Sequence, residues 1–224
     1  MKRLSNTIAA FLAFLPIGNP LAISANLAVS STAMFISIPK AYARSASSYF
    51  KKAEKQIEKE EYQKAIINLN KAIGKDALFL DAYVARSFAK YMTEDYEGSI
   101  KDATKAIEIN PEDSYIYTLR ADSKYMTDDY EGSIKDATKA IEIDPEDSYS
   151  YVVRADAKTQ INDFKGAIND STMAIGIDPE YAGAYVTRGN SKEYLDNLSG
   201  ACSDWRKAAQ LGDEDAKEYV KDDC

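Results

Sequence analysis

The chain has 224 residues, of which 28 are basic, 36 are acidic, two are cysteines and none is a histidine. The absence of histidine excludes every catalytic or metal site that needs an imidazole, including the Ser-His-Asp triad and His-ligated zinc. A hydrophobic content of 45% excludes a disordered acidic chain, and only 10 glycines and 6 prolines leave few residues for β-turns. The composition therefore favours a helical globular protein.

The first 43 residues differ in composition from the rest. Lys2 and Arg3 precede residues 4–39, which carry no charge, and residues 41–43 read A-Y-A. A positive start, an apolar middle and an A-x-A site are typical of a secretory signal peptide, cut here after Ala43, although prolines interrupt the long apolar stretch. The alternative is an uncleaved membrane anchor, because residues 21–38 are about long enough to span a bilayer.

Both alternatives place the folded part outside the cytoplasm, in a periplasm, a lumen or the medium, because the positive residues favour an inside N-terminus. Without residues 1–43, which hold three basic residues and no acidic one, 25 basic residues face 36 acidic ones and the net charge is −11. Nucleic acids and anionic membrane surfaces would be repelled by such a charge. Residues 44–48 (RSASS) are expected to form a short polar linker.

A period of 34 residues runs through the remainder. Residues 91–115 and 125–149 differ at only two of 25 positions. The period divides the chain into five units, which are 46–79, 80–113, 114–147, 148–181 and 182–215. Tyrosine, alanine and proline mark it at Tyr49, Tyr83, Tyr117, Tyr151 and Tyr185, at Ala72, Ala106, Ala140, Ala174 and Ala208, and at Pro111, Pro145 and Pro179.

Each unit is expected to form two helices. In the second unit, residues 81–93 contain no glycine or proline and predict the first helix. Asp95 suits the N-cap of the second helix, and Pro111 ends it. Because one hairpin cannot bury its apolar face alone, the units should stack into a right-handed superhelical solenoid with a concave and a convex side. Residues 216–224 are expected to cap the stack.

This pattern resembles the tetratricopeptide repeat (TPR) family in its period and in the places of its aromatic, small and proline residues. In the fourth unit, Tyr151, Ala155, Phe164, Ala174 and Pro179 occupy the family's positions. The resemblance covers residues 46–215, and units 1 and 5 depart from it as the terminal units of a capped array do. It implies an all-α solenoid of five antiparallel helix pairs and a protein-interaction scaffold with no catalytic activity and no cofactor.

The resemblance also implies that the first helix of each unit lines a concave face, which binds a segment of a partner protein. Tyrosine and methionine there offer a large, adaptable contact area, although Tyr91 and Tyr125 could instead pack against a neighbouring repeat. The basic clamp with which one TPR subgroup holds a C-terminal carboxylate is absent, which disfavours that class of partner. Asp122 and Asp156 would favour a basic or neutral partner rather than an acidic one, the alternative being that they lie on a solvated helix face. The implied groove residues are Asp81, Phe88, Tyr91, Met92, Tyr115, Asp122, Tyr125, Met126, Tyr149, Asp156, Asn190 and Tyr194.

Two sets of charged residues also recur at the repeat period. Charges near a helix interface need a partner or water, so we expect ion pairs that tie helices together, the alternative being a basic stripe for an acidic ligand. The expected pairs join Arg86, Arg120, Arg154 and Arg188 of the first helices to Asp102, Asp136, Asp170 and Asp204 of the second helices.

The two cysteines, Cys202 and Cys224, lie in the last unit and at the chain end. If the final helix folds back on the fifth unit, they reach similar heights, and an oxidising compartment would allow a disulfide between them. The alternative is a buried Cys202 and a frayed Cys224.

The predicted function is therefore an exported scaffold that binds a protein or peptide, and the alternative is a membrane-anchored assembly factor or chaperone-like adaptor for an envelope complex. No pair of carboxylates is set off from the repeat pattern, so no catalytic site is expected. The acidic runs lack the ligand spacing of a calcium loop, so no metal site is expected either.

Overall fold

The computed structural model describes residues 40–224, which form eleven α-helices and no strand. The helices are α1 (Lys40–Ile57), α2 (Tyr62–Lys75), α3 (Leu80–Tyr91), α4 (Tyr96–Ile109), α5 (Ser114–Met126), α6 (Tyr130–Ile143), α7 (Ser148–Gln160), α8 (Phe164–Ile177), α9 (Ala182–Glu193), α10 (Leu198–Gln210) and α11 (Glu214–Asp223). The first ten make five pairs and α11 follows them, which confirms the all-α architecture predicted from the repeats.

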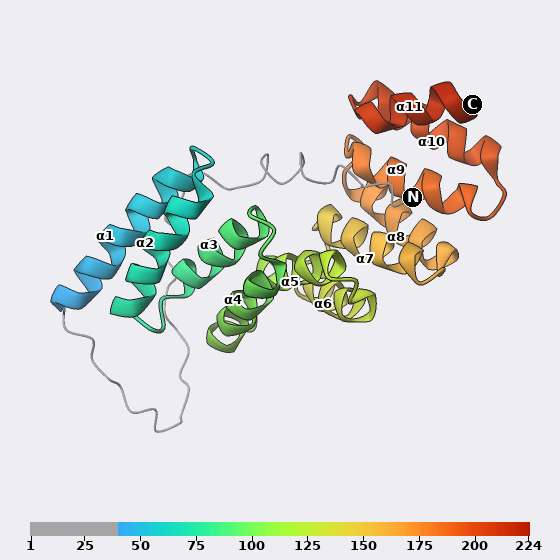
Figure 1. Ribbon diagram of the computed structural model, residues 1–224. Coiled ribbons are helices and arrows are strands. Elements are labelled where there is room, and N and C mark those ends of the chain that lie inside the picture. The colour runs from blue at the N-terminus through green and yellow to red at the C-terminus, as the bar shows by residue number, and fades with distance from the viewer. Residues whose placement is uncertain (1–39) are drawn as a thin grey trace.

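Each helix packs on the next one along the chain, so the fold grows by addition of pairs. Figure 1 shows the pairs arranged as an arc, with α3 and α5 on its inner side and α4 and α6 on its outer side. Successive odd-numbered helices also contact each other, from α1 to α3 and onward to α9. The first helix of each unit therefore lies on the inner, concave side.

The second helix of each unit from the second to the fifth begins at a side-chain cap. Asp95 accepts a hydrogen bond from the backbone N–H of Gly98 over 3.0 Å. A Cβ atom at Gly98 would lie 2.1 Å from an Asp95 carboxylate oxygen, so a side chain there would displace the carboxylate from this position. The same cap recurs at Asp129 with Gly132, Asp163 with Gly166, and Asn197 with Gly200.

The turn between the two helices of each unit contains a residue in the left-handed region. These residues follow the repeat period, and all are acidic or amide residues with φ between 58° and 63°. Their left-handed backbone conformation lets the chain reverse direction within three or four residues. They are Glu60, Glu94, Asp128, Asn162 and Asp196.

Small residues fill the space between the helices. Ala72, Ala106, Ala140, Ala174 and Ala208, one in each unit, are all 0% exposed. Larger side chains at these positions would separate the paired helices, because protein interiors are close-packed. The alanines that recur every 34 residues in the sequence therefore mark the places where paired helices come into contact.

The first helix begins earlier than the sequence pattern predicts. Residues 44–48 belong to α1, which starts at Lys40, so the expected polar linker is wrong. The segment RSASS holds neither glycine nor proline, and Ala46 is 1% exposed. Its burial stabilises helix over an extended linker. The predicted signal peptide or anchor at residues 1–43 lies almost wholly outside the described residues.

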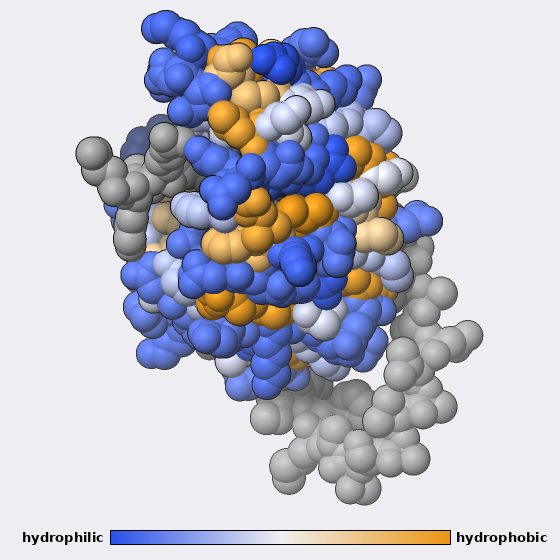
Figure 2. Space-filling view, turned by 90° about the vertical axis from the view of Figure 1, so that its right-hand side faces the viewer, coloured by the Kyte–Doolittle hydropathy of each residue, from blue (hydrophilic) through white to orange (hydrophobic). Residues whose placement is uncertain are grey.

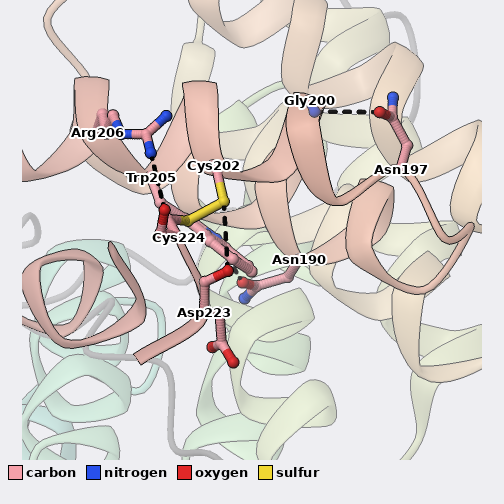
Figure 3. Close-up of a disulfide and its surroundings, with 8 residues drawn as sticks. All are labelled: Asn190, Asn197, Gly200, Cys202, Trp205, Arg206, Asp223 and Cys224. Atoms are coloured by element: carbon pink, nitrogen blue, oxygen red, sulfur yellow. Dashed lines mark hydrogen bonds between the residues drawn. A yellow bond between two sulfur atoms is a disulfide. The ribbon is translucent and has the colours of Figure 1, made fainter. Parts of the chain in front are cut away.

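The C-terminal end of the array is closed by α11. Cys202 on α10 and Cys224 after α11 form a disulfide with a Cα–Cα distance of 5.7 Å (Figure 3). Trp205 is 0% exposed, and its indole N–H donates to the Asn190 side-chain oxygen over 3.0 Å. A Cβ atom at Gly189 would lie 2.6 Å from the indole nitrogen, so the absence of a side chain there admits the tryptophan. Seen from this end of the molecule, bands of hydrophobic residues alternate with hydrophilic surface (Figure 2).

Candidate functional site

The tyrosines expected on the inner side are held by ring contacts within their own units. The ring of Tyr91 lies 5.6 Å from that of Tyr96, edge to face, and Tyr125 lies 5.6 Å from Tyr130 in the same way. The Tyr125 hydroxyl also accepts a hydrogen bond from the Gln160 side chain over 3.2 Å. Tyr91 and Tyr125 remain partly exposed, so they both pack locally and offer surface.

Two carboxylates lie on the inner helices among these tyrosines. The Tyr149 hydroxyl on α7 donates to Asp122 on α5 over 2.7 Å, and the Thr187 hydroxyl on α9 donates to Asp156 on α7 over 2.8 Å. Asp122 is only 7% exposed. Each bond joins the inner helices of neighbouring units, so the two carboxylates are fixed in position by the stack.

The surroundings of these groups shift their protonation. Burial raises the pKa of Asp122 to about 7, although the hydrogen bond from Tyr149 opposes the shift. Burial likewise raises the pKa of Asp156 to about 7 against the hydrogen bond from Thr187. The pKa of the Tyr149 hydroxyl is raised well above its usual value, first by burial and then by the charge of Asp122.

A further tyrosine joins this group that the sequence pattern did not single out. The ring of Tyr181, just before α9, lies 6.4 Å from that of Tyr149. Units 2 and 3 end in an aspartate at this position, Asp113 and Asp147, and each caps the next helix. Tyr181 makes no such cap. The departure of one unit from its neighbours was the signal that could have identified it.

Other expected groove residues differ in their surroundings. Phe88 is 3% exposed and packs edge-on against Tyr62, so it belongs to the interior and not to the groove. Its ring on α3 faces α2, the second helix of the preceding unit. Asn190 is occupied by the bond to Trp205, and Tyr194 is 63% exposed and stacks on Phe164 at the turn end of the pair. The remaining expected residues range from partly buried to exposed, namely Asp81, Met92, Tyr115 and Met126.

The periodic arginines and aspartates pair in every unit from the second to the fifth. Arg120 donates to both carboxylate oxygens of Asp136, with both distances 2.7 Å, and Lys124 lies 2.8 Å from the same carboxylate. Equivalent pairs join Arg86 to Asp102, Arg154 to Asp170, and Arg188 to Asp204, each with a lysine on the same aspartate. A bidentate pair with an added ammonium more than offsets the charge of a buried carboxylate.

Each of these arginines also reaches the preceding unit. Arg120 donates to the Thr104 hydroxyl on α4 over 3.1 Å, and its guanidinium lies 5.7 Å from the centre of the Tyr117 ring. One side chain thus joins α4, α5 and α6. The equivalent partners of Arg86, Arg154 and Arg188 are Asn70, Thr138 and Thr172. The four arginines are therefore engaged in contacts between helices, as expected for structural ion pairs.

Neither a metal centre nor a membrane-spanning helix is found within residues 40–224. No group of three or more side chains in this range could together hold a metal ion. No helix in the same range is both long and apolar enough to cross a membrane.

The sequence matches no protein-family model and no curated protein. Its structure is similar to solved structures of repeat proteins. A crystal structure of MamA protein superposes with a TM-score of 0.67 at 16% identity, covering 81% of this chain and 97% of that one. Crystalline YrrB, described as a TPR protein with an unusual peptide-binding site, superposes with a TM-score of 0.64 at 18% identity, covering 79% and 91%.

The chain has the TPR fold. A third structure, MamA residues 41 to the end from Desulfovibrio magneticus RS-1, gives a TM-score of 0.69 at 14% identity and covers 75% of this chain and 94% of that one. These likenesses span nearly the whole of the solved chains, so the TPR solenoid described here is of similar extent to theirs.

Proposed function

We propose that this TPR solenoid is a scaffold that binds a segment of another protein on its inner side. The observation that carries the proposal is the set of fixed, partly exposed tyrosines on α3 and α5, Tyr91 and Tyr125, flanked by Met92 and Met126. Aromatic side chains that are already held in place lose little entropy on binding, so contact with a partner stabilises the complex efficiently. The peptide-binding site named for YrrB supports the proposal by analogy of fold.

The partner should be basic or neutral. Asp122 and Asp156 stand among the inner tyrosines, and the chain without residues 1–43 carries a net charge of −11. Electrostatic complementarity speeds association with a positive segment and repels a negative one.

Selection from a random peptide library tests the proposal. The full-length protein is expected to enrich a consensus peptide, and the double variant Tyr91→Ala/Tyr125→Ala should bind that peptide at least tenfold more weakly, because two aromatic contacts are lost. The matched control is Met173→Ala, which removes a large side chain that is 52% exposed on α8, the second helix of its unit. Equal binding by the wild type and the double variant would refute the inner side as the binding surface.

Export is part of the same proposal. A disulfide between Cys202 and Cys224 supports an oxidising compartment, because cytosolic thiols are kept reduced. The intact mass of the protein purified from its native source distinguishes an exported scaffold with a cleaved signal peptide from a membrane-anchored adaptor. A chain that starts at Arg44 means a cleaved signal peptide, whereas a chain that retains residues 1–43 means an anchored adaptor.

A further inference from the structure

Two carboxylates of this chain lack the cations that its other buried aspartates have. Asp102, Asp136, Asp170 and Asp204 each bind one arginine and one lysine. Asp122 and Asp156 each accept a hydrogen bond from a single neutral hydroxyl, and no lysine or arginine of residues 45–224 pairs with either. A buried carboxylate without a cation is costly, so proteins keep such groups mainly where something else supplies the charge.

An independent observation at the same place points to a ligand. The hydroxyl oxygen of Tyr181 is buried and has no hydrogen-bond partner within the described part of the chain. Its pKa is raised well above the usual value, first by burial and then by the charges of Asp156 and Asp122, so it lies in the field of both carboxylates. Buried hydroxyls in native structures are nearly always bonded, so this one is open to water or to a group of a ligand. The hydroxyls of Tyr62 and Ser133 are also buried without a partner in this part of the chain, but only that of Tyr181 lies in the field of Asp122 and Asp156.

The chemistry of the lining fits a cation. Carboxylate oxygens and phenol oxygens accept hydrogen bonds from an ammonium or a guanidinium group, and the faces of tyrosine rings attract positive charge. The rings of Tyr149 and Tyr181 lie 6.4 Å apart beside the two carboxylates. An anionic or apolar side chain would leave both carboxylates without a cation.

We propose that Asp122 and Asp156, with the hydroxyl of Tyr181, bind one cationic side chain of the partner, a lysine ammonium or an arginine guanidinium group. This inference rests on the proposed function, since the cation belongs to the segment bound on the inner side. The partner thereby supplies a positive charge to Asp122 and Asp156, as Arg120 and Arg154 supply one to Asp136 and Asp170.

Binding of the cation is coupled to proton release. Because burial raises the pKa of both carboxyls to about 7, a fraction of each is protonated near neutral pH, and a cation favours the ionised form. Affinity should therefore fall as the pH is lowered from 8 to 5. The titratable groups that face the two carboxyls supply no competing cation: they are Tyr91, Tyr115, Tyr125, Tyr149, Tyr181 and Asp147.

The first experiment uses peptides enriched by the full-length protein from the random library. The consensus should contain a lysine or arginine at one position, and its replacement by norleucine should weaken binding at pH 8 at least tenfold. Asp122→Asn/Asp156→Asn should lose that preference while it still binds the norleucine peptide. Glu112→Gln and Glu146→Gln together remove the same charge from exposed turns and should leave the preference unchanged.

The outcomes separate the two proposals. If the wild type enriches peptides without a conserved cation, or if the double asparagine variant keeps the preference, the cation site is wrong and the scaffold function stands. If no peptide is enriched, the scaffold function fails and the cation site fails with it.

A second measurement uses the wild type alone. Addition of n-butylammonium or n-butylguanidinium chloride should lower the pKa values of the Asp122 and Asp156 carboxyls, read from their ¹³C resonances, relative to sodium chloride at equal ionic strength. Unchanged carboxyl titrations in saturating n-butylguanidinium would overturn the proposal, whatever the peptides show.

Discussion

At the scale of single residues, the chain treats its buried aspartates in two ways. The pairing of Arg120 with Asp136 could be predicted, because both residues recur every 34 positions and a buried charge needs a partner. The contribution of Tyr181 could not be predicted by following the period, since it appears where one unit departs from it. The period also fails to place Phe88, because position along a repeat does not give the direction in which a side chain points.

The two inner carboxyls make stability depend on pH. Their pKa values near 7 in the folded chain lie above the ordinary value of 3.8, so the folded state holds more protons than the unfolded state between these values. The free energy of unfolding therefore falls as the pH rises from about 4 to about 7, and the loss is complete above the folded pKa.

Asp122→Asn should remove most of the decrease in the free energy of unfolding that Asp122 causes as the pH rises. Asparagine keeps the acceptor for Tyr149 and carries no charge, so the variant should be more stable than the wild type by about 1–3 kcal/mol at pH 8 and nearly equal to it at pH 4. Urea denaturation at both pH values measures the difference. A destabilised variant at pH 8 would show that the ionised carboxylate is favourable in the fold.

At the scale of helices, local chemistry explains most boundaries. Asp95 and Pro111 bracket the second helix of their unit as the sequence predicts, and α4 runs from Tyr96 to Ile109 between them. The early start of α1 does not follow from local composition, because polar residues 44–48 favour a linker, whereas Ala46 is buried against the stack. Tertiary burial outweighs local composition there.

The disulfide should stabilise the last helix more than any other element. It closes a loop with a sequence separation of 22, for which chain entropy gives about 3 kcal/mol. Cys224→Ala should lower the free energy of unfolding of the α10–α11 end by about that amount, seen as faster hydrogen exchange at the amides of α11. Dithiothreitol should give the wild type the same exchange rates, and exchange unaffected by either treatment would contradict this role.

At the scale of the whole molecule, the repeat period is sufficient to predict the architecture. Tyrosine, alanine and proline at fixed spacing predict paired helices, and pairs with one apolar face each must stack. The binding surface is less predictable, because the same inner helices carry residues of the core, such as Phe88, and residues of the surface, such as Tyr91. Only packing separates them.

Removal of one complete unit should preserve the fold. Deletion of residues 114–147 joins Asp113 to Ser148 in register, so the four remaining pairs can stack as before, and the denaturant m-value should fall by about a fifth. Guanidinium titration followed by circular dichroism measures it. Deletion of residues 114–129 alone is the control: it removes one helix, places like helices against each other, and should abolish cooperative unfolding. Equal behaviour of the two deletions would contradict the additive stack.

The covalent closure lies at one end of the array only, between α10 and the residue after α11 (Figure 3). A stack in which each layer is supported only by its neighbours loses layers from whichever edge is weaker. Under heat, denaturant or mechanical tension, the helices should therefore unfold in order from α1 toward α11, with the disulfide-linked end unfolding last. The partner's cation, bound to carboxylates on α5 and α7, would then stop this sequential unfolding before it reaches α5.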